Sequence, residues 1–193
     1  MKIFLALVTL MLWPVIPLFW IPVHLGTGVL RRFGRLTYIF AAIFWIPIAY
    51  FIFLNRDLFV VNIIEFPILL SSLGLILLLA GSLLHIWTGV LLSPRSLIGI
   101  PEIVSPKESR LIDKGPFAVV RHPTYLAHTM MLVGMFLFTG VSAVGILTFA
   151  DFIVVNIIVI PLEEKELALR FGKPYREYMK RVPRLIPCLP RKP

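Results

Sequence analysis

The stretch "RHPTYLAHTMMLVGMFLFTGVSAVGILTFADFIVVNIIVIPLEE", Arg121–Glu164, decides the fold. Its apolar part, Thr124–Pro161, has about 38 residues, and only His128 and Asp151 interrupt it with ionisable groups. This length fits two membrane-spanning helices of about 18 residues each. A tight turn near Thr139–Ser142 would fold them into an antiparallel hairpin. We therefore expect the two outer ends of the stretch, "RHPTY" and "EE", to meet at one membrane surface.

The rest of the chain is also strongly apolar. Of its 193 residues, 59% are hydrophobic, compared with roughly 45–50% in soluble domains. Further apolar runs predict spans at Ile3–Val23, Leu36–Leu54 and Phe66–Leu92. Together with the hairpin they predict an all-α polytopic membrane helix bundle of about five transmembrane helices. We divide the chain into a scaffold, 1–92, and one integrated domain, 93–193, which holds a loop, the hairpin and cytoplasmic C-terminal helices.

The basic residues indicate the orientation in the membrane. All but two of the 19 Lys and Arg residues, namely all but Lys2 and Arg56, fall on one side of the predicted spans. The positive-inside rule makes that side cytoplasmic. The net charge of +9 is therefore interpreted as orientation and contact with anionic membrane lipids, and not as nucleic-acid binding. The single cysteine, Cys188, excludes an internal disulfide and a multi-cysteine zinc site, and no metal is expected.

The motif at the start of the hairpin has the composition of an anion site. Pro123 disfavours helical geometry at His122 and can itself begin a helix. Arg121 and His122 would then lie at a helix N-terminus, with Tyr125 in the first turn. Such a terminus, together with a guanidinium, suits a carboxylate or another anion. In the alternative interpretation, Arg121 is an interfacial anchor and His122 a spacer.

The motif at the end of the hairpin is acidic. Glu163 and Glu164 would face the basic motif, and a pocket between the two suits a zwitterionic ligand that also carries hydroxyls. Alternatively, the two glutamates only cap a short helix, predicted over Leu162–Phe171. Gly172 would end this helix, and Pro174 would lie in the first turn of the next one. One face of that next helix would carry Tyr175, Tyr178 and Met179.

In order and spacing, these motifs resemble those of the isoprenylcysteine carboxyl methyltransferase and phospholipid methyltransferase superfamily. The resemblance covers about Arg110–Pro187. The matching residues are Leu111-Ile112, Gly115-Pro116-Phe117, Arg121-His122-Pro123-Thr124-Tyr125, Glu163-Glu164, Phe171-Gly172, Tyr175, Tyr178 and Arg184-Leu185-Ile186-Pro187.

The resemblance implies an integral membrane enzyme that transfers a methyl group from S-adenosylmethionine to a lipophilic or membrane-embedded acceptor, with the cofactor site and the C-terminus cytoplasmic. It assigns catalysis to Arg121, His122 and Glu164. The implied cofactor site consists of Leu111, Ile112, Phe117, His122, Pro123, Tyr125, Glu163 and Glu164.

Two departures from the family pattern bear on the acceptor. Phe117 replaces a tyrosine, and Asn156–Leu162 lacks the basic residue that the prenylcysteine enzymes carry before the acidic pair. A lipid amine, a lipid-linked carboxylate, a thiol or sulfide, and a prenylcysteine all stay open as acceptors. Asp151 and Asn156 are candidates to face the acceptor, whereas His85 is interpreted as a packing residue. The alternatives for Asp151 are a position near the extracytoplasmic end of its span or a hydrogen bond within the bundle. Two rival functions are an NADPH-dependent membrane reductase of the sterol-reductase type and a non-catalytic membrane protein that retains the fold.

Overall fold

The structure is a computed structural model that describes residues 1–13, 21–22, 32–34, 36–92 and 111–187. Within these residues it is helical, and three helices are long and apolar enough to cross a membrane. They are α4 (Leu36–Leu54), α6 (Ile68–Leu92) and a continuous helix over Ser142–Phe171. The predicted all-α membrane class is confirmed, while the number of five spans stays a prediction.

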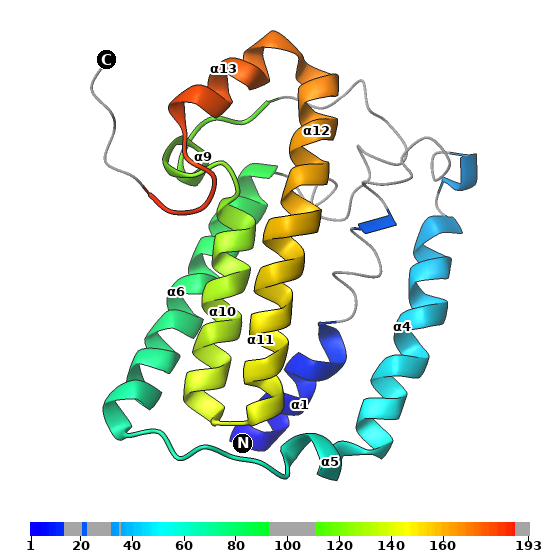
Figure 1. Cartoon of the computed structure of the whole chain (residues 1–193), viewed down its shortest axis with the longest axis vertical. Coiled ribbons are helices and arrows are strands. Elements are labelled where there is room, and N and C mark those ends of the chain that lie inside the picture. The colour runs from blue at the N-terminus through cyan, green and yellow to red at the C-terminus, as the bar shows by residue number, and fades with distance from the viewer. Residues whose placement is uncertain (14–20, 23–31, 35, 93–110, 188–193) are drawn as a thin grey trace.

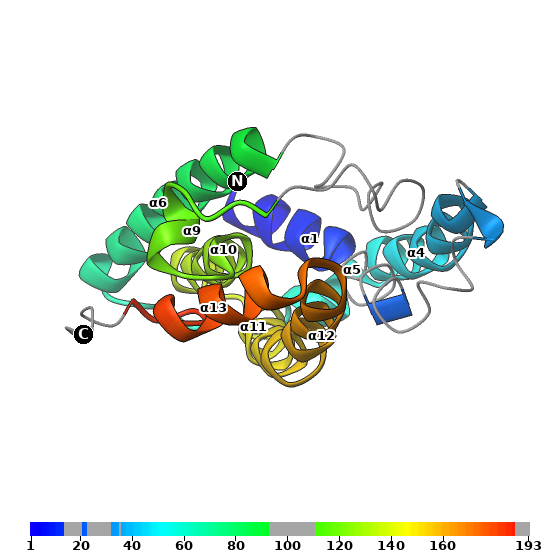
Figure 2. The same ribbon diagram turned by 90° about the horizontal axis from the view of Figure 1, so that it is seen from above.

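The remaining helices connect or cover these long ones (Figure 1). Helices α6, α10 and α11 stand side by side, and α1 packs against α10, α11 and α4 (Figures 1 and 2). Helix α13 lies across one end of the bundle, next to α9. The shorter elements are α1 (Lys2–Leu12), α5 (Arg56–Val60), α9 (Pro116–Val119), α10 (Pro123–Thr139), α11 (Ser142–Val154) and α13 (Lys173–Arg181).

Glycines set the close packing of α6 against α10. A Cβ atom added to Gly134 would lie 2.6 Å from the carbonyl oxygen of Gly74, and one added to Gly81 would lie 2.8 Å from the carbonyl oxygen of Ala127. Only residues without a side chain permit two helix backbones to approach this closely, as is common in membrane bundles. The turn of α6 around Gly81 is therefore held against the first half of α10.

The predicted hairpin and its turn are confirmed. Helix α10 ends at Gly140, whose φ of 72° is left-handed, and α11 begins at Ser142. The N–H of Ile64 donates to the carbonyl oxygen of Gly140 at 2.7 Å, so the turn is tied to the segment before α6. Behind the turn, helices from both parts of the chain form one apolar core: Ala6, Leu10, Ile52, Met135, Val141 and Val144.

The predicted helix over Leu162–Phe171 is present and ends before Gly172 as predicted. Its start as a separate helix is wrong, because the chain is helical without a break from Ser142 to Phe171. A π-helical turn, η3 (Val155–Val159), precedes α12 (Ile160–Phe171), and the N–H of Ile160 donates to the carbonyl oxygen of Val155. This wider turn accommodates Pro161, which has no N–H to donate. Glu163 and Glu164 consequently lie inside a continuous helix, so the alternative that they cap a helix N-terminus is wrong too.

The first predicted span, Ile3–Val23, is only partly described. Helix α1 covers Lys2–Leu12, is too short to cross a membrane by itself, and is followed by a turn at Trp13. Most of the remainder of that span lies outside the described residues, and so does Cys188. Residues 93–110, which form most of the loop at the start of the second predicted domain, also lie outside them.

Candidate functional site

The two outer ends of the hairpin meet through Glu164. Its Oε1 accepts hydrogen bonds from Nε and Nη2 of Arg121 at 3.0 and 2.7 Å, and its Oε2 accepts one from Nη2 of Arg184 at 2.9 Å. Nε2 of His122 lies 3.2 Å from the same Oε1. The expected contact between "RHPTY" and "EE" is thus direct. We call the group formed by Arg121, His122, Glu163, Glu164 and Arg184 the charged cluster.

Arg121 connects the start of α10 to the C-terminal end of α13. Its Nη1 donates to the carbonyl oxygens of Met179 and Val182 at 2.9 and 2.6 Å, which are among the carbonyls that a helix end leaves without an internal partner. The backbone N–H of Arg121 donates to the carbonyl oxygen of Pro183 at 2.8 Å. Because its donors serve the protein itself, Arg121 holds the tail in place instead of presenting an open guanidinium.

His122 is buried between the two glutamates. Its side chain is 3% exposed, and Nδ1 lies 3.6 Å from Oε2 of Glu163. Burial lowers the pKa of His122, but hydrogen bonds to Glu163 and Glu164 and their negative charge outweigh it, so that the pKa is raised above 6.5. The carboxylates on both sides of the ring therefore favour its charged form.

Two tyrosines of α13 line the same end of the molecule, as the predicted apolar face requires. The hydroxyl of Tyr178 donates to the carbonyl oxygen of Phe117 in α9 at 2.6 Å, and burial raises the pKa of Tyr178 to about 12. Tyr175 is 1% exposed, and its hydroxyl has no hydrogen-bond partner in the described chain. Burial, followed by the charges of Glu164 and Glu163, raises the pKa of Tyr175.

The other residues expected at the site are placed less directly. Phe117 and Pro123 are buried, and the ring of Tyr125 lies 5.8 Å from that of His122. Leu111 and Ile112 lie in the segment before α9, are partly buried, and form no hydrogen bond to the charged cluster in the described part of the chain.

Arg184 and Tyr178 were absent from the expected set of site residues. Arg184 contacts Glu164, and Tyr178 fixes α13 to α9. The sequence contained a signal for both, since they belong to the tyrosines and the closing Arg-x-x-Pro of the family pattern.

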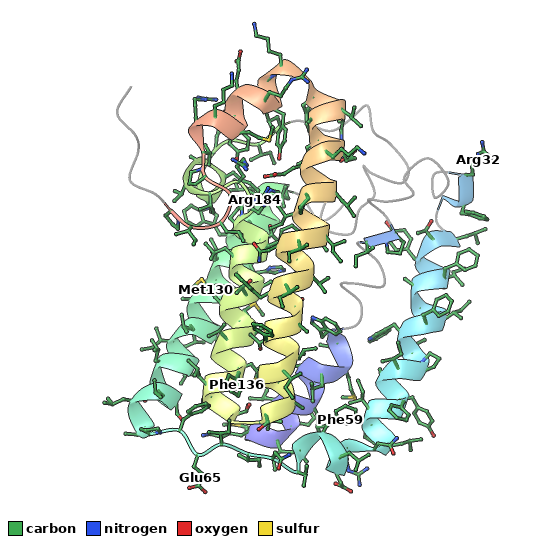
Figure 3. All side chains as sticks on the ribbon, in the orientation of Figure 1. Arg32, Phe59, Glu65, Met130, Phe136 and Arg184 are labelled. Carbon is green, nitrogen blue, oxygen red and sulfur yellow. The ribbon has the colours of Figure 1, made fainter. Side chains whose placement is uncertain are left out.

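The charged cluster can hold a polar ligand beside it, but not between its two poles. Arg121 and Glu164 touch, whereas Glu163 is 25% exposed and the Tyr175 hydroxyl lacks a partner among the described residues. A carboxylate accepts hydrogen bonds from hydroxyl or ammonium groups, and a phenol can donate as well as accept. An open pocket of about 330 Å³ lined by Lys2 and Glu65 is a different place. It lies at the opposite end from Arg184 (Figure 3).

Comparison with known proteins shows which sequences this chain resembles. A sequence profile described as phospholipid methyltransferase matches residues 69–174, which include α6, the hairpin and α12. The chain is 28% identical over 141 residues to protein-S-isoprenylcysteine O-methyltransferase B of Arabidopsis thaliana, with 67% of this chain and 68% of that protein covered.

A second relative is methanethiol S-methyltransferase of Pseudomonas deceptionensis. It is 40% identical over 78 residues, which are 40% of this chain and 28% of that protein. No solved structure matches significantly.

Proposed function

Because the chain belongs to the phospholipid methyltransferase family, we propose that it is a methyltransferase that transfers a methyl group from S-adenosylmethionine to a lipophilic acceptor at the cytoplasmic face of a membrane. The observation that carries the proposal is the charged cluster, in which Glu164 joins Arg121, His122 and Arg184. The cluster lies at the outer end of the hairpin that the family profile covers.

The described residues fit the cofactor by their chemistry. S-adenosylmethionine presents a carboxylate, an ammonium group, ribose hydroxyls and an adenine ring. Glu163 offers a partly exposed carboxylate, and Tyr175 offers a buried hydroxyl that lacks a partner in the described chain. Phe117 offers a buried aromatic ring in α9, and Tyr125 offers a ring 5.8 Å from that of His122. These four residues, together with His122, would hold the cofactor.

The remaining members of the charged cluster act as supports. Glu164 and Arg121 fix the tail, and with it Tyr175, against the start of α10. When bound, the cofactor supplies a methyl group already activated by the sulfonium, so the protein's main task is alignment. Alignment can lower a barrier by as much as about 7–11 kcal/mol in well-oriented systems. Tyr178, which is bonded to Phe117, keeps α13 and α9 together and helps to exclude water.

The absence of basic residues in 156–162 disfavours an acceptor that binds through a carboxylate. The two relatives are named for acceptors of different chemistry, a prenylcysteine and methanethiol. We therefore propose an acceptor that is lipophilic and reaches the site from the bilayer.

Cofactor binding tests the proposal. We expect the protein, purified in detergent, to bind S-adenosylhomocysteine in calorimetry and to show no binding of NADPH. Incubation with methyl-labelled S-adenosylmethionine and a membrane lipid extract should then label a lipid-soluble product. Binding of NADPH alone would replace the proposal with a reductase, and binding of neither compound would indicate a non-catalytic protein.

A further inference from the structure

A second polar group lies inside the bundle, away from the charged cluster. Nε2 of His128 on α10 is 3.3 Å from Oδ2 of Asp151 on α11, and we call these two residues the buried pair. Nε1 of Trp13, at the end of α1, donates to Oδ1 of Asp151 at 2.7 Å. Asp151 is 1% exposed and His128 is 18% exposed, so only the histidine is accessible.

The buried pair lies below the charged cluster along the hairpin. His128 is six residues after His122, about 9 Å along the helix axis. Between them, Tyr125 packs against an apolar cluster formed by Val155 and Ile160 of the other helix of the hairpin and Leu185 of the tail. On the far side of the pair, Thr148 donates to the carbonyl oxygen of Leu132. The buried pair therefore lies deeper in the hairpin than the charged cluster.

The buried pair is not a satisfied structural contact. Despite their separation of 3.3 Å, His128 Nε2 and Asp151 Oδ2 are poorly aligned, and neither atom has a hydrogen-bond partner within the described residues. His85 on α6, near enough to His128 to interact with it electrostatically, also has a buried Nδ1 without a partner there. Ionisable groups inside a membrane bundle are costly and usually have a function. Over the described ranges, no group of three or more His, Cys, Asp or Glu residues is arranged to hold a metal ion.

We propose that the buried pair is the acceptor site and that the acceptor is a neutral thiol whose proton passes to Nε2 of His128. This inference rests on the function proposed above. In the transfer, the S–H bond of the thiol breaks and its proton binds the imidazole. The sulfur electron pair forms a bond to the methyl carbon while the bond from that carbon to the sulfonium breaks, which leaves a neutral thioether on each side. His128 later releases its proton to water.

The two residues of the buried pair have different roles. His128 touches the acceptor and is a catalytic residue. Asp151 acts through His128 as a positioning residue, because its charge stabilises the imidazolium. Trp13 holds Asp151 in place from α1. A thiol becomes a strong nucleophile only as the thiolate, so a base at this position has a direct task.

The charges around the buried pair select against an anionic acceptor. Apart from His85 and His128, helices α1, α6, α10 and α11 contain one basic residue, Lys2, whose Nζ lies over the ring of Phe138 at the other end of α10. A carboxylate would therefore meet Asp151 without a compensating cation. A thiol is uncharged, dissolves in the bilayer, and has one proton to lose.

The test separates the acceptor site from cofactor binding. We would compare wild type with Asp151→Asn and His128→Gln, using 1-decanethiol and thiophenol in detergent micelles as acceptors. Asp151→Asn keeps an oxygen for Trp13 but removes the charge. We expect S-adenosylhomocysteine affinity to stay within twofold of wild type, while kcat for 1-decanethiol falls at least tenfold. Thiophenol enters as a neutral thiol too, but it is a much stronger acid and needs the imidazole less to lose its proton, so its kcat should fall less than threefold.

A control and a second measurement keep the inference falsifiable. Ile146→Ala is the control, because its side chain lies on α11 like Asp151 but is 71% exposed; it should leave both rates unchanged. Equal losses with both thiols, or unchanged rates in both variants, would overturn the inference.

If the variants do not fold, the solvent deuterium isotope effect on the wild type decides. The 1-decanethiol rate should be slowed in D₂O, because proton transfer to Nε2 of His128 accompanies methyl transfer, and the thiophenol rate should be slowed less. His85→Gln should leave that difference intact. Cofactor binding without transfer to any thiol would overturn the inference alone, whereas absence of cofactor binding would overturn the proposed function as well.

Discussion

The charged cluster and the buried pair are two groups of ionisable residues on the same hairpin, and they differ in how well their atoms are partnered. In the charged cluster, both oxygens of Glu164 accept hydrogen bonds and Arg121 uses its donors on one carboxylate and two carbonyls. In the buried pair, the facing atoms of His128 and Asp151 lack partners in the described chain. The hydrogen-bonded contact between Glu164 and Arg121 has the properties of a support, whereas the buried pair has the properties of a place where protons move.

The difference is sharpest at Glu164, where we expect the largest effect. Glu164→Gln removes the carboxylate partner of Arg121, and leaving a largely buried charge without its partner costs roughly 3–5 kcal/mol. Binding of S-adenosylhomocysteine should weaken at least about 100-fold, measured by calorimetry. Glu177→Gln on α13, whose side chain is 57% exposed, is the matched control and should bind normally. Normal binding by Glu164→Gln would remove the supporting role of the charged cluster.

Trp13→Phe tests the buried pair and should have the next largest effect. It keeps an aromatic side chain but removes the hydrogen bond to Asp151. Loss of a partner to a buried charged group costs about 1–3 kcal/mol, so we expect methyl transfer to fall about tenfold with cofactor affinity unchanged. Trp87→Phe, at a position 55% exposed, is the control. Loss of cofactor binding in Trp13→Phe would show that the two groups are not separable.

Tyr178→Phe should have a smaller effect, confined to the charged end. The ring stays packed, but the carbonyl oxygen of Phe117 loses its donor. A typical hydrogen bond contributes about 1 kcal/mol, so cofactor affinity should fall about fivefold. Tyr50→Phe, at an exposed position, should have no effect. If Tyr178→Phe lowered the rate of methyl transfer without weakening cofactor binding, the assignment of Tyr178 to the cofactor-binding end would be wrong.

The pH dependence of stability should give the smallest effect. The pKa of His122 is raised in the folded protein, so the stabilisation from its charged form is complete below pH 6.5 and is lost as pH rises through the raised value. The Tm of wild type should therefore fall relative to that of His122→Gln over this interval, by about 2–4 °C. Parallel Tm curves for the two proteins would contradict the raised pKa.

The sequence by itself determined the membrane class, the α4 boundaries, the hairpin and its turn, and the meeting of "RHPTY" with "EE". These features depend on the length of apolar runs and on local rules for proline and glycine. A run of about 38 apolar residues is too long for one span and suits two, so its ends must return to the same side.

Only the tertiary structure decided how the side chains pair. The π-helical turn before Pro161 adds a residue to one turn, which rotates the helix after it by about 100° and determines where Glu163 and Glu164 point. Trp13 meets Asp151 across 138 residues of sequence. Such contacts depend on the rotation and register of packed helices, to which hydropathy is insensitive. The apolar pattern therefore identified where the hairpin folds, but not which of its polar residues have hydrogen-bond partners.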